Sequence, residues 1–568
     1  MGLALLLSLI IFFTYQWFFP PPPPAPMAPE STASQAIETS QQPAPQAEVI
    51  VAAENTKDES FAAEPKTITI VTDKTAITID TVGGILRGYE LKDFQSKAEA
   101  RSPYKDMLRG SEGSYALFLG LKGYDSLTSE KVFQVVSDED LSSGGRRITL
   151  AWQDKNIRLE KIFDVGTDDS PYVVQTSYKI LNRTDKAYQL TPYLENRLRQ
   201  KDMPVRSGFL GKISGPQPDH FGSVYYKGDR LFTRHAADKD VTKNFEREAQ
   251  ESWESFQNVN DTGAVAWSSI TDRYFLYALA PNLGSDSKIS ATTAEFVRDG
   301  DFLVNRFYTQ SILVNPGEAS GDEFLSYMGP KKRDEMAAVG IALEKIVDYG
   351  WFDVIAIGIL WFMTQIHKVI PNWGLVIITL TFIVKLILQP INKKSMTSMK
   401  AMQLLQPKLQ EIKKKYPDDK QKQNDEVMKL FKTHKVNPLG GCLPMLLQMP
   451  IYIALYKVLW NAIELYHSPF LWYRDLSAPD PYFVSPILLG LFMFLQQKLT
   501  PSATTDPAQQ KMMLIMPVMF SAFMLFLPVG LVIYIFVNTF MSVLQQFMMQ
   551  RDLSFKDLLT GKWQAKQA

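Results

Sequence analysis

One apolar stretch, residues 373–391, constrains this chain more than any other feature. Its sequence, WGLVIITLTFIVKLILQPI, is long enough to cross the hydrocarbon core of a bilayer as an α-helix. A single charged residue, Lys385, lies inside it. A lysine at mid-membrane costs about 2.5–3.5 kcal/mol, but each aliphatic residue or Phe returns about 0.3–0.6 kcal/mol. We therefore expect this segment to insert as a transmembrane helix.

Lys385 shares a helical face with two other polar residues. Thr381 precedes it by four positions and Gln389 follows it by four, a spacing that aligns the three side chains on a helix. One interpretation is that this face borders a hydrated cavity, where Lys385 meets a polar or negatively charged group. The other is that the lysine stem snorkels to the membrane surface, because Pro390 and Lys393 follow closely. The helix alone leaves both interpretations open.

Length and composition exclude several classes of protein. With 568 residues the chain is too long for one hydrophobic core, so two or three domains are expected. The single cysteine, Cys442, excludes an intramolecular disulfide and a cysteine-rich metal site. The five histidines lack metal-motif spacing, and there is no phosphate-binding glycine loop or GxSxG motif. We expect no catalytic residues, no metal and no cofactor.

The start of the chain predicts an anchor followed by a tether. Residues 1–19 are apolar, end in aromatic residues and run into a row of prolines. No A-x-A cleavage site follows, so a retained transmembrane anchor is expected rather than a signal peptide. Residues 20–65 are rich in Pro, Ala, Gln, Glu and Ser, a composition typical of a disordered tether.

Residues 66–328 show the alternation of apolar and polar residues that is typical of β-strands, for example in TITIVT and TAITID. Helical periodicity is scarce, and Gly, Asp and Asn turns are frequent. This pattern predicts one large, all-β, antiparallel sandwich. Its tryptophans, among them Trp152 and Trp267, are expected to pack in the core rather than to bind a ligand.

Residues 329–372 change to helical periodicity. Met336, Val339, Leu343, Ile346 and Val347 repeat at intervals of three and four opposite a charged face. The pattern predicts an amphipathic helix on the membrane surface. The apolar residues 351–363 are assigned to the same interfacial region, so that the crossing begins at residue 373.

Residues 392–437 are strongly basic, with twelve lysines against five acidic residues. Two apolar stripes, in residues 396–416 and 427–431, predict an antiparallel helical hairpin. The positive-inside rule places it in the cytoplasm. Exposure to water and the cytoplasmic location of the hairpin are enough to explain why most of these lysines are present. A further attraction to anionic lipids or to ribosomal RNA, without specificity for a nucleic-acid sequence, is a secondary prediction.

Residues 438–547 predict four further crossings. Two span residues 442–464 and 482–497, and a pair of about 16 residues each is split near Pro528, short enough to thin the bilayer. Together with residues 1–19 and 373–391 this gives six crossings in an α-helical transmembrane core. By this count the sandwich lies on the outer side, and the hairpin and the tail, residues 548–568, lie in the cytoplasm.

Polar residues recur on these later helices. Polar groups at membrane depth need partners or water, and a hydrogen bond between helices explains each of them singly. Several helices that each carry one polar stripe instead predict a shared hydrophilic substrate groove. The predicted groove residues are Lys385, Thr381, Gln389, Gln448, Tyr534, Asn538 and Ser542.

Three stretches of the helical region are distinctive: NPLGGCLPMLLQMPIYIALY (437–456), DPAQQKMM (506–513) and FLPVGLVIYIFVN (526–538). They resemble the YidC family of membrane protein insertases of Gram-negative inner membranes. The resemblance implies a periplasmic sandwich similar to sugar mutarotases without demonstrated catalysis. It also implies a groove open to cytoplasm and lipid but closed toward the periplasm. The implied function is an insertase and chaperone for nascent membrane proteins, working alone or with the Sec translocon and with translating ribosomes.

The groove differs from the family pattern at two positions. The family has an arginine at the position that Lys385 matches, so the charge is kept but the two-pronged guanidinium is lost. Thr381 and Tyr534 match family positions near substrate helices, whereas a second tyrosine common in the family is Ile535 here. The tail is also less basic than in many members, which weakens ribosome docking through it.

Two other functions are consistent with parts of the sequence. A solute or ion transporter with Lys385 in its site predicts an inverted repeat, which the sequence does not show. A membrane-anchored periplasmic carbohydrate-binding protein would need the sandwich for its function and could dispense with the helical core.

Overall fold

A computed structural model describes residues 64–99, 101–108, 113–124, 126–167, 169–199, 222–235, 258–282, 292–417, 419–434, 443–499 and 507–550. The predicted anchor, nearly all of the predicted tether and most of the predicted tail lie outside these residues.

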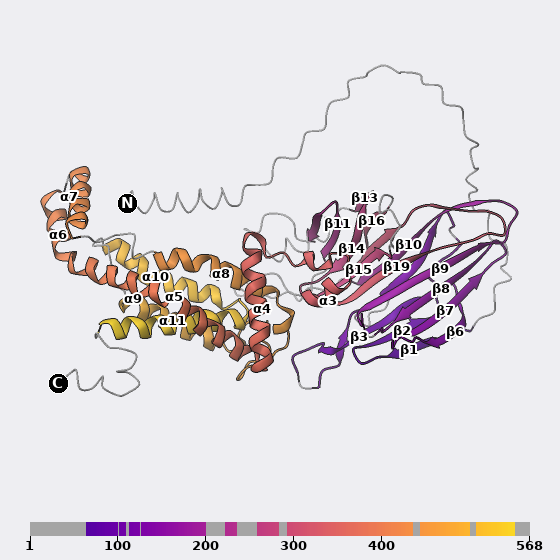
Figure 1. The fold of residues 1–568 in the computed structure, drawn as a ribbon, viewed down its shortest axis with the longest axis horizontal. Helices are drawn as coiled ribbons and strands as arrows, with labels where there is room; N and C mark the ends of the chain where they lie inside the picture. Colours follow the sequence, from indigo (N-terminus) through magenta and orange to yellow (C-terminus); the bar gives the residue numbers. More distant parts are fainter. Residues whose placement is uncertain are drawn as a thin grey trace, which may run out of the picture. The chain divides into compact units, whose positions relative to one another are not determined.

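The first half of the described chain forms two antiparallel β-sheets (Figure 1). One sheet has ten strands with the order β1-β2-β3-β5-β10-β17-β16-β13, where β4 pairs with β3 and β18 with β10. The other has nine strands with the order β12-β11-β14-β15-β19-β9-β8-β7-β6. Neighbours along the chain often pair, but β10 lies beside β5, and β9 beside β19, across long separations in sequence.

The strand bounds in the first sheet are β1 Thr67–Val71, β2 Thr75–Asp80, β3 Ile85–Gln95, β4 Tyr104–Asp106, β5 Tyr115–Lys122, β10 Tyr188–Arg199, β13 Val259–Thr262, β16 Thr293–Asp299, β17 Phe302–Tyr308 and β18 Ile312–Val314. Those in the second sheet are β6 Gln134–Asp140, β7 Arg146–Gln153, β8 Ile157–Val165, β9 Val173–Asn182, β11 Gly222–Lys227, β12 Arg230–His235, β14 Val265–Thr271, β15 Phe275–Pro281 and β19 Ala319–Pro330.

Inward-facing apolar residues of both sheets form one core. On β8 buried and half-buried residues alternate along the whole strand, as expected where one face of a strand meets the other sheet. Trp152 and Trp267 are buried in this core, as predicted.

Lys161 on β8 is also buried in this core. Its ammonium donates hydrogen bonds to the carbonyl oxygens of Gly84, at 2.7 Å, and Leu117. The nitrogen also lies 4.8 Å from the centre of the Phe163 ring. Burial lowers the pKa of Lys161 well below its usual value, because an apolar environment disfavours the charged form.

We expect the sandwich to become more stable as the pH rises through the alkaline range toward about 10.4, the usual pKa of an unfolded lysine. Lys161 binds fewer protons in the folded state than in the unfolded state, so unfolding takes up a proton and is opposed at higher pH. This contribution is lost as the pH falls through the lowered pKa of the folded state. The slope is at most about 1.4 kcal/mol per pH unit, up to an unfolded pKa of about 10.4.

Thermal unfolding followed by near-ultraviolet circular dichroism at several pH values checks this prediction. The slope should shrink in Lys161→Met. It should persist in Lys179→Met, which changes an exposed lysine on the neighbouring strand β9. Equal slopes in the two variants would show that Lys161 does not cause the pH dependence.

The predicted membrane-surface helix over residues 334–347 is wrong. Helix α3 (Arg333–Ala338) ends before Gly340, which has φ +80°, and Ala342 has φ +59° before the 3₁₀ turn η2 (Leu343–Ile346). Met336 and Leu343 are buried in the core of the sandwich, and the other residues of the stripe pack against it. The apolar stripe therefore covers the sandwich instead of a membrane.

The second half of the described chain is helical (Figure 1). Helix α4 packs on α5 and α8, α5 packs on α11, and α9 packs on both α10 and α11. The bounds are η3 Gly350–Phe352, α4 Asp353–Val369, α5 Trp373–Leu404, α6 Gln406–Lys415, α7 Lys420–Thr433, α8 Leu443–Asn461, η5 Ile463–Leu465, α9 Val484–Leu499, α10 Pro507–Met524 and α11 Val529–Gln550.

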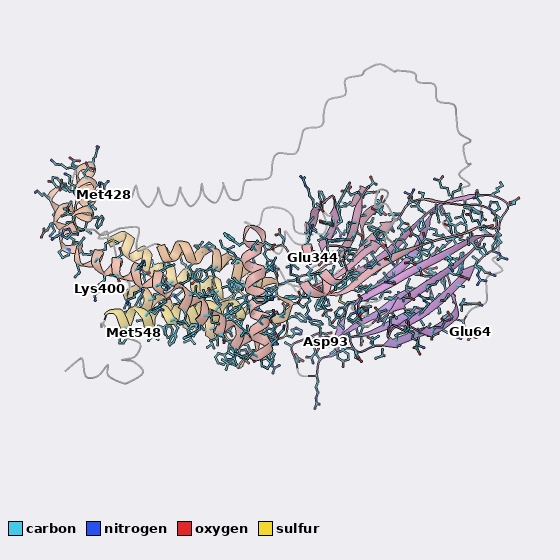
Figure 2. The ribbon with its side chains drawn as sticks, viewed as in Figure 1. Glu64, Asp93, Glu344, Lys400, Met428 and Met548 are labelled. Atoms are coloured by element: carbon cyan, nitrogen blue, oxygen red, sulfur yellow. The ribbon has the colours of Figure 1, made fainter. Side chains whose placement is uncertain are left out.

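The predicted helix boundary at residue 391 is not observed. Helix α5 continues through Pro390 to Leu404, so the first part of the predicted hairpin belongs to the membrane helix. The hairpin itself consists of α6 and α7, held by a small core of Met402, Leu405, Leu409 and Phe431. Met428, which is labelled on this hairpin in Figure 2, lies on α7 and is 49% exposed.

The prediction of two short crossings is wrong for α11 but not for α10. Helices α10 and α11 have 18 and 22 residues, or about 27 and 33 Å at 1.5 Å per residue, so only α10 is shorter than the hydrocarbon core of about 30 Å. By length and composition two described helical stretches could cross a membrane, Trp373–Met402 and Val529–Met548, with mean hydropathies of 2.1 and 1.6. The apolar stretches Val484–Leu499 and Leu514–Met524 are shorter. The expected thinning is therefore not supported by α11.

Candidate functional site

Lys385 lies in the middle of the bundle and not at its surface. Its side chain is on the second half of the apolar part of α5, and the residue is 6% exposed. The ammonium donates a hydrogen bond of 2.7 Å to Ser542 Oγ on α11. Helices α5, α8, α9, α10 and α11 contain no Asp or Glu in their sequences. Within the described residues, Lys385 thus has a neutral hydroxyl as its partner and no carboxylate.

The Lys385–Ser542 hydrogen bond is the end of a connected polar network. Ser542 Oγ donates to the carbonyl oxygen of Asn538 at 2.9 Å, and the Asn538 amide donates to the Tyr452 hydroxyl on α8. The Tyr452 ring packs edge-on against Tyr534 of α11, with ring centres 5.7 Å apart. We call the six linked side chains the polar cluster: Lys385, Gln448, Tyr452, Tyr534, Asn538 and Ser542.

Gln448 completes this cluster from α8. Its amide nitrogen donates to the Tyr534 hydroxyl at 3.2 Å, and it is 9% exposed. Tyr534 is 1% exposed. Three helices that are far apart in the sequence thus bring polar side chains to one place, and every one of these side chains has a partner, as the interior of a membrane protein requires.

Two predicted groove residues lie outside the polar cluster. Gln389, one turn beyond Lys385, accepts a hydrogen bond of 2.6 Å from the Gln545 amide, which ties α5 to α11 a second time. The Thr381 hydroxyl donates to the carbonyl oxygen of Ile377 in its own helix at 2.7 Å and is buried. Thr381 therefore needs no partner from another helix.

Sequence reasoning missed Tyr452. It follows Gln448 by four positions on α8, just as Asn538 follows Tyr534 on α11. The spacing alone placed Gln448 and Tyr452 on one face. A tyrosine among apolar residues in a membrane helix is also common at the lipid interface, so its role as a partner of Asn538 required the positions of α8 and α11.

The bundle is apolar at one end and polar at the other. The beginnings of α5 and α11 and the end of α8 meet in a core of aliphatic and aromatic residues, among them Ile377, Leu380, Val458, Leu459 and Val532. The polar cluster begins directly beyond this core on all three helices. A hydrated path that reached Lys385 would therefore be blocked at the end where α8 finishes and α11 starts.

Comparison with known proteins places the chain in a family. Two family models match it in succession: the YidC periplasmic domain matches residues 67–362, and the 60Kd inner membrane protein matches residues 365–556. The membrane protein insertase YidC of Mannheimia succiniciproducens is 33% identical over 574 residues, which cover 99% of this chain and 98% of that protein. The chain belongs to the YidC family of membrane protein insertases.

A second YidC relative gives the same assignment. The membrane protein insertase YidC of Haemophilus influenzae is 34% identical over 505 residues, which cover 87% of this chain and 88% of that protein. A crystal structure of an active YidC insertase with its first transmembrane domain resolved matches with 19% identity and a TM-score of 0.35, covering 86% of this chain and 94% of that one.

Membership of the YidC family confirms the coarse prediction from the sequence. The chain is an inner-membrane protein with a large all-β periplasmic domain and a helical C-terminal region. The comparisons support neither the transporter nor the carbohydrate-binding alternative.

Proposed function

We propose that this chain inserts membrane proteins through a hydrophilic groove lined by the polar cluster, together with Thr381 and Gln389. In this groove Lys385 attracts acidic residues of a translocating tail. The observation that carries the proposal is the environment of Lys385, a buried ammonium in a bundle in which helices α5, α8, α9, α10 and α11 contain no acidic residue. A positive charge without a counter-ion at low dielectric attracts a negative group that arrives from outside.

The division of the bundle gives the groove a direction. The apolar core at the start of α5 and α11 closes the outer end, and the polar cluster opens toward the inner end. A tail that enters from the cytoplasm reaches Lys385 part-way across the membrane. The distance that the tail must still cross is then shorter than the full thickness of the bilayer, even if the bilayer is not thinned around α10 and α11.

The topology that goes with this function has six crossings. They are residues 1–19 and helices α5, α8, α9, α10 and α11, with the sandwich outside and the α6–α7 hairpin inside. Helix α4 lies in the outer interface, since Val354 and Trp361 on one side are 85% and 62% exposed while Ala356 and Met363 are buried against the bundle. Exposed apolar side chains on one face and packed ones on the other are typical of an interfacial helix.

The substrate itself supplies the driving force. Transfer of its helix into lipid gains about 0.3–0.6 kcal/mol per strongly apolar residue, so nucleotide, metal and cofactor are not needed, and the chain is not an enzyme. The exit lies along α10, where Met516 and Met519 are 60% and 69% exposed. Flexible methionine side chains can accommodate apolar helices of different shape.

The surfaces of the chain that face the cytoplasm and the lipid suggest its binding partners. Nascent membrane proteins are the substrates, delivered alone or with the Sec translocon. The lysines of the α6–α7 hairpin whose side chains the structure describes are exposed. They suit contact with the ribosome and with anionic lipid headgroups, and the tail makes a weaker contribution. This attraction depends on phosphate charge and not on a nucleic-acid sequence.

Site-specific photocrosslinking to a ribosome-stalled nascent chain tests the proposal. Photoreactive residues at positions 381 and 534 should crosslink to the substrate several-fold more strongly than residues at 386 and 387. Leu386 and Ile387 are matched controls, because they lie on α5 beside Lys385 but are 56% and 68% exposed on the other side of the helix. Equal crosslinking from the four positions would show that the substrate does not use this face.

A further inference from the structure

The segment between α8 and α9 contains a tight hairpin with an apolar tip. Phe470 and Tyr473 exchange both backbone hydrogen bonds, each 2.9 Å long, so Leu471 and Trp472 form a two-residue turn. Such turns favour Gly, Asn or Asp, because their backbone needs positive φ. Here Leu471 has φ +53° and is 72% exposed, and Trp472 is 48% exposed.

A second exposed apolar pair lies close by in sequence. Tyr482 and Phe483, just before α9, are 67% and 42% exposed, and Phe483 also has positive φ, +58°. The backbone thus adopts unfavourable conformations at two large apolar residues that stay 72% and 42% exposed within the described chain. A partner outside the chain that covered these side chains would help to offset the strain.

The base of the hairpin is firmly attached to the bundle. Phe470 packs on the start of α5 so closely that a Cβ on Gly374 would lie 2.1 Å from its ring. The Tyr473 hydroxyl donates to the Asp480 carboxylate, which in turn accepts hydrogen bonds from the backbone and the hydroxyl of Ser485 at the start of α9.

The same segment also holds the start of α11. The backbone nitrogens of Val529 and Gly530 donate to the carbonyl oxygens of Ala478 and Leu476, at 2.8 and 2.9 Å. The segment from Pro469 to Ser485, here called the cap, therefore joins the outer ends of α5, α9 and α11. A rigid base beneath an exposed apolar tip is the arrangement expected of a membrane anchor.

We propose that the tip of the cap, formed by Leu471 and Trp472 with Tyr482 and Phe483, inserts into the interfacial region of the outer leaflet. Lipid is the occupant that the surroundings favour. Arg474 is exposed two residues from the tip, where it meets headgroup phosphates, and tryptophan and tyrosine prefer this depth. The apolar surface also continues along α9 through Ile487 and Leu491, which are 63% and 59% exposed.

This anchor fixes the depth of the cap, and with it the apolar end of the bundle, relative to the lipid. The proposal of an anchor rests on the topology given under Proposed function, in which the α8–α9 connection lies on the outer side of the membrane. The two proposals nevertheless fail separately, because substrate crosslinking at positions 381 and 534 does not depend on lipid contact at the cap.

Depth-dependent quenching of the full-length protein in phosphatidylcholine and phosphatidylglycerol vesicles tests the anchor. Cys442 is first replaced by Ser, and Trp472→Cys is labelled with an environment-sensitive fluorophore. A lipid with a spin label near the headgroup should quench this probe at least about twofold more strongly than the same label on Ser142→Cys, an exposed turn residue of the sandwich. Aqueous iodide should show the opposite order.

A probe at Tyr482→Cys gives an independent measurement if the variant at position 472 does not fold. Strong iodide quenching of both cap probes, without quenching by spin-labelled lipid, would overturn the proposal. Protection from iodide that appears only in native membranes would likewise overturn it, and would assign the tip to a protein partner instead of lipid.

Discussion

Lys385→Glu is expected to lower the insertion of a short substrate with an acidic tail at least about tenfold, equivalent to about 1.4 kcal/mol. The variant replaces attraction by repulsion at a residue that is 6% exposed and has no acidic neighbour on helices α5, α8, α9, α10 and α11. At that depth charges are poorly screened, so one reversal acts strongly. Protease protection of the translocated tail in inverted membrane vesicles measures the effect.

Three comparisons separate the charge from other effects of the substitution. Lys394→Glu makes the same change at an exposed position of α5 and should insert the substrate normally. Lys385→Gln keeps a hydrogen-bond donor for Ser542 but removes the charge. Its insertion of the acidic-tailed substrate should be intermediate between that of the wild type and that of Lys385→Glu. A substrate with a neutral tail should be nearly indifferent to all three variants, and an equal loss for both substrates would remove the electrostatic mechanism.

The polar cluster was largely predictable because membrane helices make polar residues conspicuous. In a segment that must be apolar to insert, Lys385, Gln448, Asn538 and Ser542 stand out, and spacing by four shows which share a face. Which residue bonds to which was not predictable. The hydrogen bond from Lys385 to Ser542 joins residues 157 positions apart, and it depends on how α5 packs against α11.

Helix ends were harder to predict than helix faces, since hydropathy marks where lipid ends and not where a helix ends. Helix α5 continues to Leu404 because the Lys, Met, Ala and Gln residues after Ile391 favour helix. Helix α11 extends past Asn538, Ser542 and Gln545 because none of these residues breaks a helix as Gly or Pro would. The prediction for the apolar stripe from Met336 to Val347 failed for a different reason. An apolar face does not reveal whether lipid or a β-sandwich will cover it.

In the sandwich, too, the sequence predicts which residues are buried but not which elements lie side by side. Alternation on β8 predicts which face is buried, but the pairing of β9 with β19 joins residues more than 130 positions apart. Pairing over such distances depends on the complete fold, so composition and periodicity predicted the class of the domain without its strand order.

Gly374→Ala is expected to be the most disruptive small substitution in the helical region. A Cβ at this position would lie 2.1 and 2.2 Å from two ring atoms of Phe470, far inside van der Waals contact. The ring is 9% exposed and belongs to the base of the cap, so it cannot swing freely. Overpacking of this kind costs about 1–3 kcal/mol, and the thermal unfolding midpoint in detergent should fall accordingly.

Gly358→Ala is the matched control, because Gly358 is also a helical glycine, on α4, but a Cβ there meets nothing within 4 Å. It should leave the midpoint unchanged or raise it, since alanine favours helix over glycine by about 1 kcal/mol. The double variant Gly374→Ala with Phe470→Ala should lose less stability than the two single losses together, because the smaller side chain at 470 gives the new methyl group room. Strict additivity would mean that the two positions are not in contact. The cap would then not be held to α5 through this pair, and its attachment to the bundle would rest on the hydrogen bonds from Val529 and Gly530 of α11 and from Ser485 of α9.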